Sequence, residues 1–296
     1  MKVRIGVGVG ASPLGEPAEF GRLVDDLEGL GFDSLWMPEV LTAPTLDPLA
    51  ALAFAAARSS HLKLGTTLLL PGRNPVRLAK QLATLDVLSG GRLLATCVPG
   101  LPRQPESGAV GVAGADKGRL MDEVIPLLRR LWAGDLVTHH GEAADFTDVT
   151  LSPLPVQQPL EVWTGGMVPA ALRRCGRFAD GWLPSACTPV EAAAGRLVID
   201  ETASEAGRAI SPEHFGVSLA YASRPLDAKV LRALSGSRRG LDPVEVVPVG
   251  LDGLRTMLER FLEVGFSKFV VRPLEQPGSW RAELEALAEA VLDLQT

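Results

Sequence analysis

The chain has 296 residues, of which 46% are hydrophobic and 22% charged, a composition that predicts a soluble globular protein with a large core. Its formal net charge of −6 supplies no basic field for a phosphate backbone, which argues against nucleic-acid binding. The longest apolar run, residues 48–57, is too short to span a bilayer, so we expect no membrane partner.

The first ten residues alternate as a strand does and lack the continuous apolar segment of a secretory signal. Three widely spaced cysteines form no CxxC pair. We therefore expect a cytoplasmic protein with reduced thiols. The histidines lack metal-ligand spacing and the chain has no GxSxG motif, so neither a metal site nor a serine hydrolase is predicted.

Strand-like runs alternate with helical patterns along the chain, which is the signature of βα units and a parallel sheet. We predict helices at Pro17–Leu30, Asp47–Ser60, Pro75–Leu88 and Gly118–Trp132. No low-complexity linker breaks this rhythm, so we expect one continuous barrel domain over residues 1–296. The eight predicted strands are Val3–Val9, Ser34–Met37, Lys63–Leu70, Leu93–Val98, Glu161–Thr164, Gly181–Pro184, Phe215–Tyr221 and Lys268–Arg272.

Two stretches depart from the βα rhythm. Thr138–Gln158 reads as a short β excursion with a Pro-rich exit, and Ser223–Pro248 as a mobile helical insertion. By contrast, Leu62–Arg92 runs from an apolar strand through a Pro-Gly turn into an amphipathic helix. Ligands bind at such carboxyl ends in parallel α/β folds, so we expect the site there.

A glycine-rich turn, TGGMVPAAL at residues 164–172, joins a strand end to a helix start. Its free amides near the positive end of the helix dipole suit a phosphate, although the same glycines also suit simple chain reversal. The opening GVGVGASP lacks the last glycine and the helix start of a dinucleotide motif. Gly8 and Gly10 are instead expected to leave room for a ligand.

Five motifs stand out along the chain. They are residues 31–39 (GFDSLWMPE), 66–92 (TTLLLPGRNPVRLAKQLATLDVLSGGR), 114–135 (GADKGRLMDEVIPLLRRLWAGD), 162–182 (VWTGGMVPAALRRCGRFADGW) and 265–273 (GFSKFVVRP). Together these motifs resemble the bacterial-luciferase-like superfamily of flavin- and deazaflavin-dependent oxidoreductases. The resemblance implies a TIM-type (β/α)₈ barrel with insertions that binds coenzyme F420, a 5-deazaflavin, or alternatively FMN, at the carboxyl ends of its strands.

The resemblance also implies cofactor contacts. In similar proteins a non-prolyl cis peptide or a bulge ends the third strand, and the register here puts it at Thr66–Thr67; the alternative is that two β-branched residues simply suit a strand. The ring is then expected against Thr66 to Leu68 and the phosphate on Gly165 and Gly166. The full set of predicted cofactor-binding residues is Gly8, Thr66, Thr67, Leu68, Gly100, Trp163, Gly165, Gly166 and Met167.

Glu39 and Glu106 stand at positions where similar proteins carry acidic residues, and both are candidate catalytic residues. The alternatives without a catalytic role are a solvated loop carboxylate for Glu39 and helix capping for Glu106. Val40 replaces the histidine that commonly follows Glu39, which argues against a sugar-phosphate dehydrogenase. Prolines at 99, 102 and 105 also stiffen the loop after the fourth strand, so the substrate side of the pocket departs from the family pattern.

The resemblance implies an oxidoreductase that moves a hydride between coenzyme F420 and a small organic substrate. One alternative is an FMN-dependent monooxygenase, and another is a vestigial, non-catalytic subunit that carries a cofactor. Relatives commonly dimerise through the helices that follow the second and third strands. We therefore expect a homodimer, with contacts from Leu49, Leu52, Ala53 and Ala56.

Overall fold

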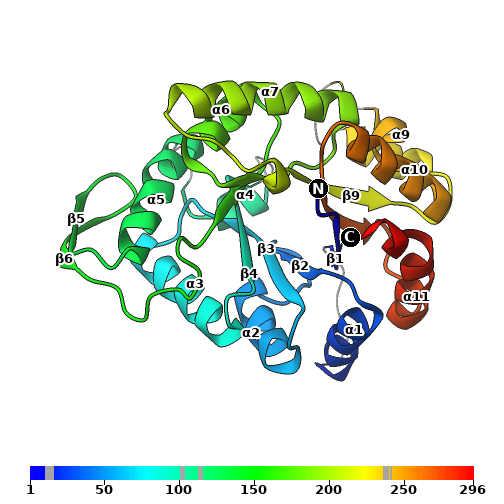
Figure 1. Cartoon of the computed structure of the whole chain (residues 1–296), viewed down its shortest axis with the longest axis horizontal. Helices are drawn as coiled ribbons and strands as arrows, with labels where there is room; N and C mark the ends of the chain where they lie inside the picture. Colours follow the sequence, from blue (N-terminus) through cyan, green and yellow to red (C-terminus); the bar gives the residue numbers. More distant parts are fainter. Residues whose placement is uncertain (11–16, 101–103, 113–115, 236–239, 241) are drawn as a thin grey trace.

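The computed structural model describes residues 1–10, 17–100, 104–112, 116–235, 240 and 242–296. A sheet of eight parallel strands lies at its centre, in the order β8-β7-β4-β3-β2-β1-β10-β9. Parallel bridges from Trp182 to Phe215 and from Ser185 to Ser218 join the two outer strands, so the sheet closes into a TIM-type barrel (Figure 1). The strands are β1 (Arg4–Gly8), β2 (Ser34–Pro38), β3 (Lys63–Leu69), β4 (Leu93–Val98), β7 (Val162–Thr164), β8 (Gly181–Trp182), β9 (Gly216–Tyr221) and β10 (Lys268–Pro273).

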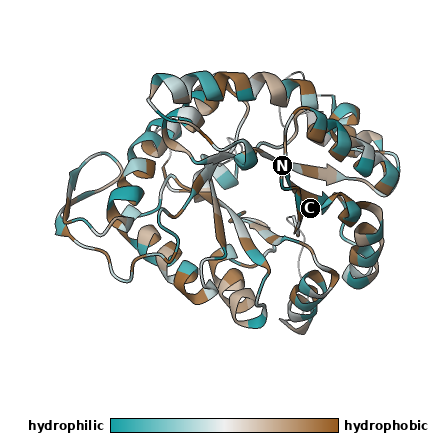
Figure 2. Cartoon of the chain, viewed as in Figure 1, coloured by the Kyte–Doolittle hydropathy of each residue, from teal (hydrophilic) through white to brown (hydrophobic). Residues whose placement is uncertain are grey.

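Helices surround this barrel, as Figure 1 shows. In Figure 2 these helices carry hydrophilic and hydrophobic stretches side by side, as expected of amphipathic helices packed on a sheet. They are α1 (Pro17–Leu30), α2 (Pro48–Arg58), α3 (Pro75–Ser89), α5 (Lys117–Trp132), α6 (Pro169–Phe178), α7 (Pro189–Glu205), α10 (Gly250–Glu263) and α11 (Trp280–Val291), with short helical turns η1 (Pro212–His214) and η2 (Leu292–Leu294). Within the described ranges, no helix combines the length and apolar character needed to cross a membrane.

The two expected insertions are present. Residues 137–149 form an antiparallel hairpin of β5 (Val137–His140) and β6 (Asp145–Val149), which projects from the barrel in Figure 1. The second insertion contains α8 (Ala228–Ser235) and α9 (Pro243–Val246). A further short helix, α4 (Glu106–Ala109), lies in the loop after β4.

Side-chain alternation along the strands builds two cores. On β3, Leu64 and Leu68 pack outward with the helices, whereas Gly65 and Thr67 face the barrel interior, because successive strand residues point to opposite faces. Trp36, Trp163, Leu183 and Val270 fill the interior as a separate cluster. The interior is therefore packed by large side chains, and little of it is open.

Two glycines make room for the interior indoles. A Cβ atom at Gly65 would overlap the ring of Trp36, and a Cβ at Gly181 would overlap that of Trp163. Each glycine lies on a strand next to the one that carries its tryptophan. The barrel interior thus accommodates two indole rings because the facing positions on the neighbouring strands carry no side chain.

The predicted irregularity at Thr66–Thr67 is wrong. Thr66 pairs with Ala95 and Thr67 with Thr96 in an uninterrupted ladder, and the cis peptide bonds among the described residues all precede prolines. The hydroxyl of Thr66 donates to the Met37 carbonyl of β2 at 3.0 Å. The two β-branched residues therefore serve an ordinary strand, which was the alternative interpretation.

Candidate active site at the carboxyl ends of the strands

A cavity of about 340 Å³ opens at the carboxyl ends of β1, β2, β3, β9 and β10. This volume falls within the ~300–1,000 Å³ range of small-molecule sites. The residues that line it are mostly apolar, with a few polar groups. They are Gly8, Gly10, Trp36, Met37, Pro38, Val40, Thr67, Leu183, Ser218, Val270 and Arg272.

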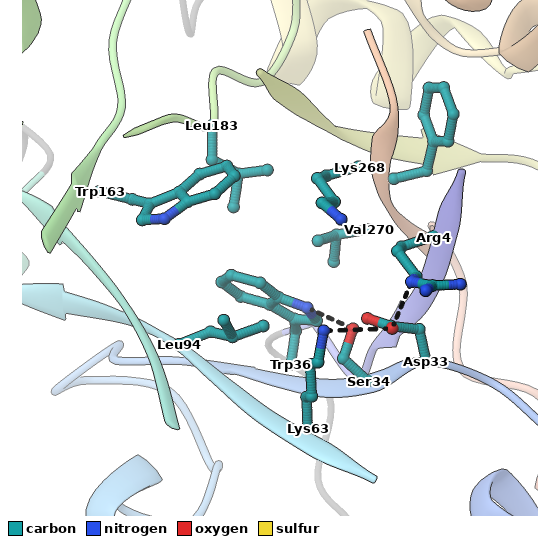
Figure 3. A pocket seen from close by; sticks show the side chains of 11 residues that line it. Arg4, Asp33, Ser34, Trp36, Lys63, Leu94, Trp163, Leu183, Lys268 and Val270 are labelled. Atoms are coloured by element: carbon teal, nitrogen blue, oxygen red, sulfur yellow. Dashed lines mark hydrogen bonds and ion pairs between the residues drawn. The ribbon is translucent and has the colours of Figure 1, made fainter. Parts of the chain in front are cut away.

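A second, much smaller cavity of about 40 Å³ lies at the amino ends of the strands (Figure 3). Trp36, Leu183 and Val270 line both spaces, so these three side chains form the partition between them. At the small cavity, Asp33 Oδ1 forms ion pairs with Arg4 Nε at 3.4 Å and with Lys63 Nζ at 3.6 Å. We assign the ligand site to the larger cavity, because ligands of such barrels bind at the carboxyl ends.

The exit of β1 is kept open beside this larger cavity. A Cβ atom on Gly8 would lie 3.3 Å from Val270 Cγ1 and 3.4 Å from Arg272 Cβ, which is tight for a side chain. Gly10 has a φ of 65°, a conformation that favours glycine. Gly8 therefore lies where the sequence predicted it, at the wall of the cavity.

Glu39 is buried and fully engaged. One carboxylate oxygen accepts from the Leu69 amide at 2.8 Å, and the other forms an ion pair with Arg73. Arg73 also donates to the Leu69 carbonyl at 3.2 Å. Glu39 thus ties the end of β2 to the β3–α3 loop, and the alternative of a solvated loop carboxylate is wrong.

Glu106 is also buried, at the start of α4. One oxygen accepts from the Leu41 amide at 2.8 Å, and the other accepts from the amide and the hydroxyl of Thr42, at 3.1 and 2.7 Å. Burial alone raises the pKa of this carboxyl, but the hydrogen bonds from Thr42 and Leu41 outweigh burial and lower the pKa from its ordinary value. Its partners lie in the loop after β2, so it joins two loops rather than capping its own helix.

The turn at Gly165–Val168 presents free amides. Among the described residues, none accepts a hydrogen bond from the amides of Gly165, Gly166 or Met167, and Val168 caps α6 without a side-chain acceptor. Trp182 Nε1 donates to the Gly166 carbonyl at 3.1 Å, which turns the amide of the same peptide, that of Met167, away from the indole. The φ of 97° at Gly166 requires glycine in this turn.

The other predicted contacts divide by strand face. Thr67 lines the cavity, but Thr66 and Leu68 point away from it, because the alternation of β3 turns them outward. Gly100, with a φ of 79°, packs against Leu69, and Met167 packs against the outer core. Of the predicted triplet on β3, only one side chain reaches the cavity.

Trp163 does not line the carboxyl-end cavity, contrary to expectation. Its indole nitrogen donates to Glu161 at 3.0 Å, and its ring lies 5.5 Å from that of His214. Both partners precede strands, so the indole leans toward the amino end and walls the small cavity in Figure 3. A strand position fixes which face a side chain takes but not its tilt along the strand.

Arg272 and Ser218 line the cavity but were not predicted as site residues. The signal for Arg272 was present in VVRP at the end of the last strand, where a charged side chain follows buried valines. Pro102, one of the prolines expected to stiffen the fourth loop, lies outside the described residues.

A closed parallel barrel with a ligand-sized cavity at its carboxyl ends defines a TIM-barrel protein. The family model described as luciferase-like monooxygenase matches residues 1–289. The chain therefore belongs to the luciferase-like monooxygenase family, as its motifs indicate.

Individual relatives include an F420-dependent dehydrogenase and a monooxygenase. The chain is 30% identical over 207 residues to an F420-dependent glucose-6-phosphate dehydrogenase of Microbacterium testaceum, which covers 65% of the chain and 60% of that protein. It is 29% identical over 171 residues to limonene 1,2-monooxygenase of Rhodococcus erythropolis, covering 56% of the chain and 44% of that protein. The matched part thus spans about half the length of these curated relatives.

The fold has solved counterparts. The structure of coenzyme F420 dependent tetrahydromethanopterin reductase from Methanopyrus kandleri superposes with a TM-score of 0.81 and covers 100% of both chains. Sequence identity to that protein is 18%, so this likeness establishes the fold alone.

Proposed function

We propose that the protein is an oxidoreductase that binds a deazaflavin or flavin at the carboxyl end of its barrel. More specifically, we propose coenzyme F420 as the cofactor and a small organic molecule as the hydride donor or acceptor. Family membership and the F420-dependent relative support this proposal. A cytoplasmic location and a homodimer stay predictions.

The observation that carries the proposal is the set of free amides at Gly165–Val168. A helix amino terminus without a side-chain cap, preceded by unpaired amides, suits a phosphate group through both hydrogen bonds and the helix dipole. Coenzyme F420 and FMN both carry such a group, and these residues would hold it. When bound, a 5-deazaflavin supplies two-electron hydride exchange.

The chain's own residues contribute by positioning and by excluding water. Arg272 is the titratable side chain among the described lining residues; Thr67 and Ser218 add hydroxyls, and Val40 and Leu183 add apolar walls. Holding the cofactor and the substrate in the reactive orientation lowers the activation barrier without an acid or a base. In favourable cases this contribution reaches roughly 7–11 kcal/mol.

We propose that Glu39 and Glu106 are positioning residues. Every carboxylate oxygen of the pair accepts a hydrogen bond or forms an ion pair within the loops around the cavity. Glu39 holds the loop that follows β3, and Glu106 holds the loop that follows β2. In this proposal the two carboxylates do not act on the substrate directly. They fix the loops that form the rim of the cavity.

For the proposed homodimer, only part of the expected contact set on α2 is available to a partner subunit. Leu52 and Ala56 of α2 are buried in the chain's own core, so they are not free for a partner. Leu49 and Ala53 are partly buried, and Phe54 on the same helix is 45% exposed.

Parallel titrations with coenzyme F420 and FMN test the cofactor. We expect tight F420 binding and weak FMN binding. Tight FMN binding without measurable F420 binding would promote the monooxygenase, and failure of both would promote the vestigial subunit.

The Gly166→Val variant tests the turn, since its Cβ would crowd Ala171 and its φ strains any side chain. We expect at least tenfold weaker cofactor binding. Gly207→Val is the matched control, because Gly207 has a φ of 68° in a turn with open space around it. Equal loss of binding in both variants would point to general strain and overturn the role of the turn.

A further inference from the structure

Arg272 lies at the carboxyl end of β10, where it pairs in register with Ala220 of β9 and lines the larger cavity. Its side chain is half-buried. Burial lowers the pKa of the guanidinium below its ordinary value, and no neighbouring carboxylate counteracts this effect. Among the described residues, none forms an ion pair or a hydrogen bond with this side chain.

Other sheltered guanidinium groups of the molecule are compensated in two ways. Arg92 and Arg208 donate to backbone carbonyls. In three further cases, a carboxylate oxygen lies 2.7 Å or less from a guanidinium nitrogen, as expected where charges leave water. The pairs are Arg73 with Glu39, Arg129 with Asp180 and Arg174 with Asp122. Arg272 differs from these five because it has neither a carboxylate nor a carbonyl partner among the described residues.

The space beside Arg272 is kept free. A Cβ on Gly8 would touch the Arg272 stem at 3.4 Å, and a Cβ on Gly10 would lie 3.8 Å from its Nη1. Glycine at both positions leaves the guanidinium accessible from the β1 side. Val270, Leu183 and Val40 provide apolar surface in the same cavity, so an occupant is expected to combine an anionic group with an apolar body.

We propose that Arg272 is the binding group for a carboxylate carried by the substrate, so that the substrate class is small organic acids with an apolar portion. The planar fork of a guanidinium matches a carboxylate through two parallel hydrogen bonds and fixes its orientation. This proposal rests on the proposed function, because it identifies the molecule that shares the cavity with the cofactor.

The alternative source of the anion is the cofactor itself. The turn at Gly165–Val168 follows β7, and β10 is three strands away from β7 around the closed barrel by the shorter path through β8 and β9. The amides proposed to bind the cofactor phosphate therefore lie on a different part of the barrel rim from Arg272. This separation favours the substrate as the source of the second anion.

Benzoate and benzamide are the probes, because they share a shape and differ in charge. We expect benzoate to bind the F420-loaded protein, measured by calorimetry, at least tenfold more tightly than benzamide. Arg272→Met should weaken benzoate binding by about 10- to 100-fold, as expected for loss of a charged hydrogen-bonded pair, and leave cofactor affinity within about threefold.

Lys268→Met is the matched control, because it removes a half-buried cation from the amino end of the same strand. It should leave benzoate binding unchanged. A thermal melt of Arg272→Met should show unchanged or higher stability, since the variant removes an uncompensated charge, so loss of binding will not reflect unfolding.

Equal binding of benzoate and benzamide, or benzoate binding that survives in Arg272→Met, would overturn the proposal. Loss of F420 affinity in Arg272→Met, with benzoate unaffected, would assign the arginine to the cofactor and overturn it also. If wild type binds neither F420 nor FMN but the ligand-free protein binds benzoate through Arg272, the anion site stands and the proposed function fails.

Discussion

The two ends of the barrel interior share a wall but differ in whether a carboxylate lies among their cations. At the amino end, Arg4 and Lys63 form ion pairs with Asp33 around a cavity of about 40 Å³, and Lys268 on the same cavity wall also interacts electrostatically with this carboxylate. At the carboxyl end, Arg272 faces a cavity of about 340 Å³ with no described counterion. A cation beside a carboxylate of its own fold needs no further anion, whereas a cation beside open space without such a carboxylate is available to a ligand.

Trp36→Ala would break the partition between the two ends and should have the largest effect. Removing a buried indole leaves a cavity and typically costs about 3–5 kcal/mol of unfolding free energy. Urea denaturation measures the loss. Trp36→Phe is the control and should lose less, because a ring still separates the two spaces; equal losses would mean that the partition contributes nothing specific.

The Glu39–Arg73 pair tests whether paired charge at the carboxyl rim is structural. Glu39→Gln leaves the Arg73 guanidinium without its anion and should lower the free energy of unfolding by about 2–3 kcal/mol. Arg73→Met and the double variant complete a double-mutant cycle. The double variant should lose less than the sum of the single losses, and strict additivity would show that the two groups are not coupled.

The buried carboxylate of Glu106 at the carboxyl rim can be tested through the pH dependence of stability. Its replacement should have the smallest effect of the three on the free energy of unfolding. Because folding lowers its pKa, its charged form adds stability above the unfolded pKa of about 4.3, and this contribution is lost as pH falls through the folded pKa. Glu106→Gln should therefore cost about 1–2 kcal/mol at pH 7 and less at pH 3. Urea unfolding at both values measures the difference, and a pH-independent cost would contradict the argument.

The sequence predicts the eight strands to within one or two residues because strand-like runs alternate with helical patterns along the chain. Gly8 and Thr67 were found as cavity residues because strand ends converge at one edge of the barrel. Finer geometry escaped this reasoning. The tilt of Trp163 depends on Glu161 and His214, and neither contact can be inferred from spacing along the chain.

Glu39 and Arg272 show the same limit for the candidate site. A carboxylate after a strand has the same sequence signature whether it meets a substrate or an arginine, and only the fold reveals Arg73 beside Glu39. Arg272 was missed because a charged residue that ends a strand is ordinary on a surface. What distinguishes it is the lack of a partner among the described residues, which is a property of three-dimensional packing.

The pairing of Gly65 with Trp36, and of Gly181 with Trp163, constrains how this barrel can vary. Each glycine and its tryptophan occupy one shared volume across neighbouring strands, so neither position can grow unless the other shrinks. We therefore expect a larger side chain at 65 or 181 to fit only together with a smaller one at 36 or 163, respectively.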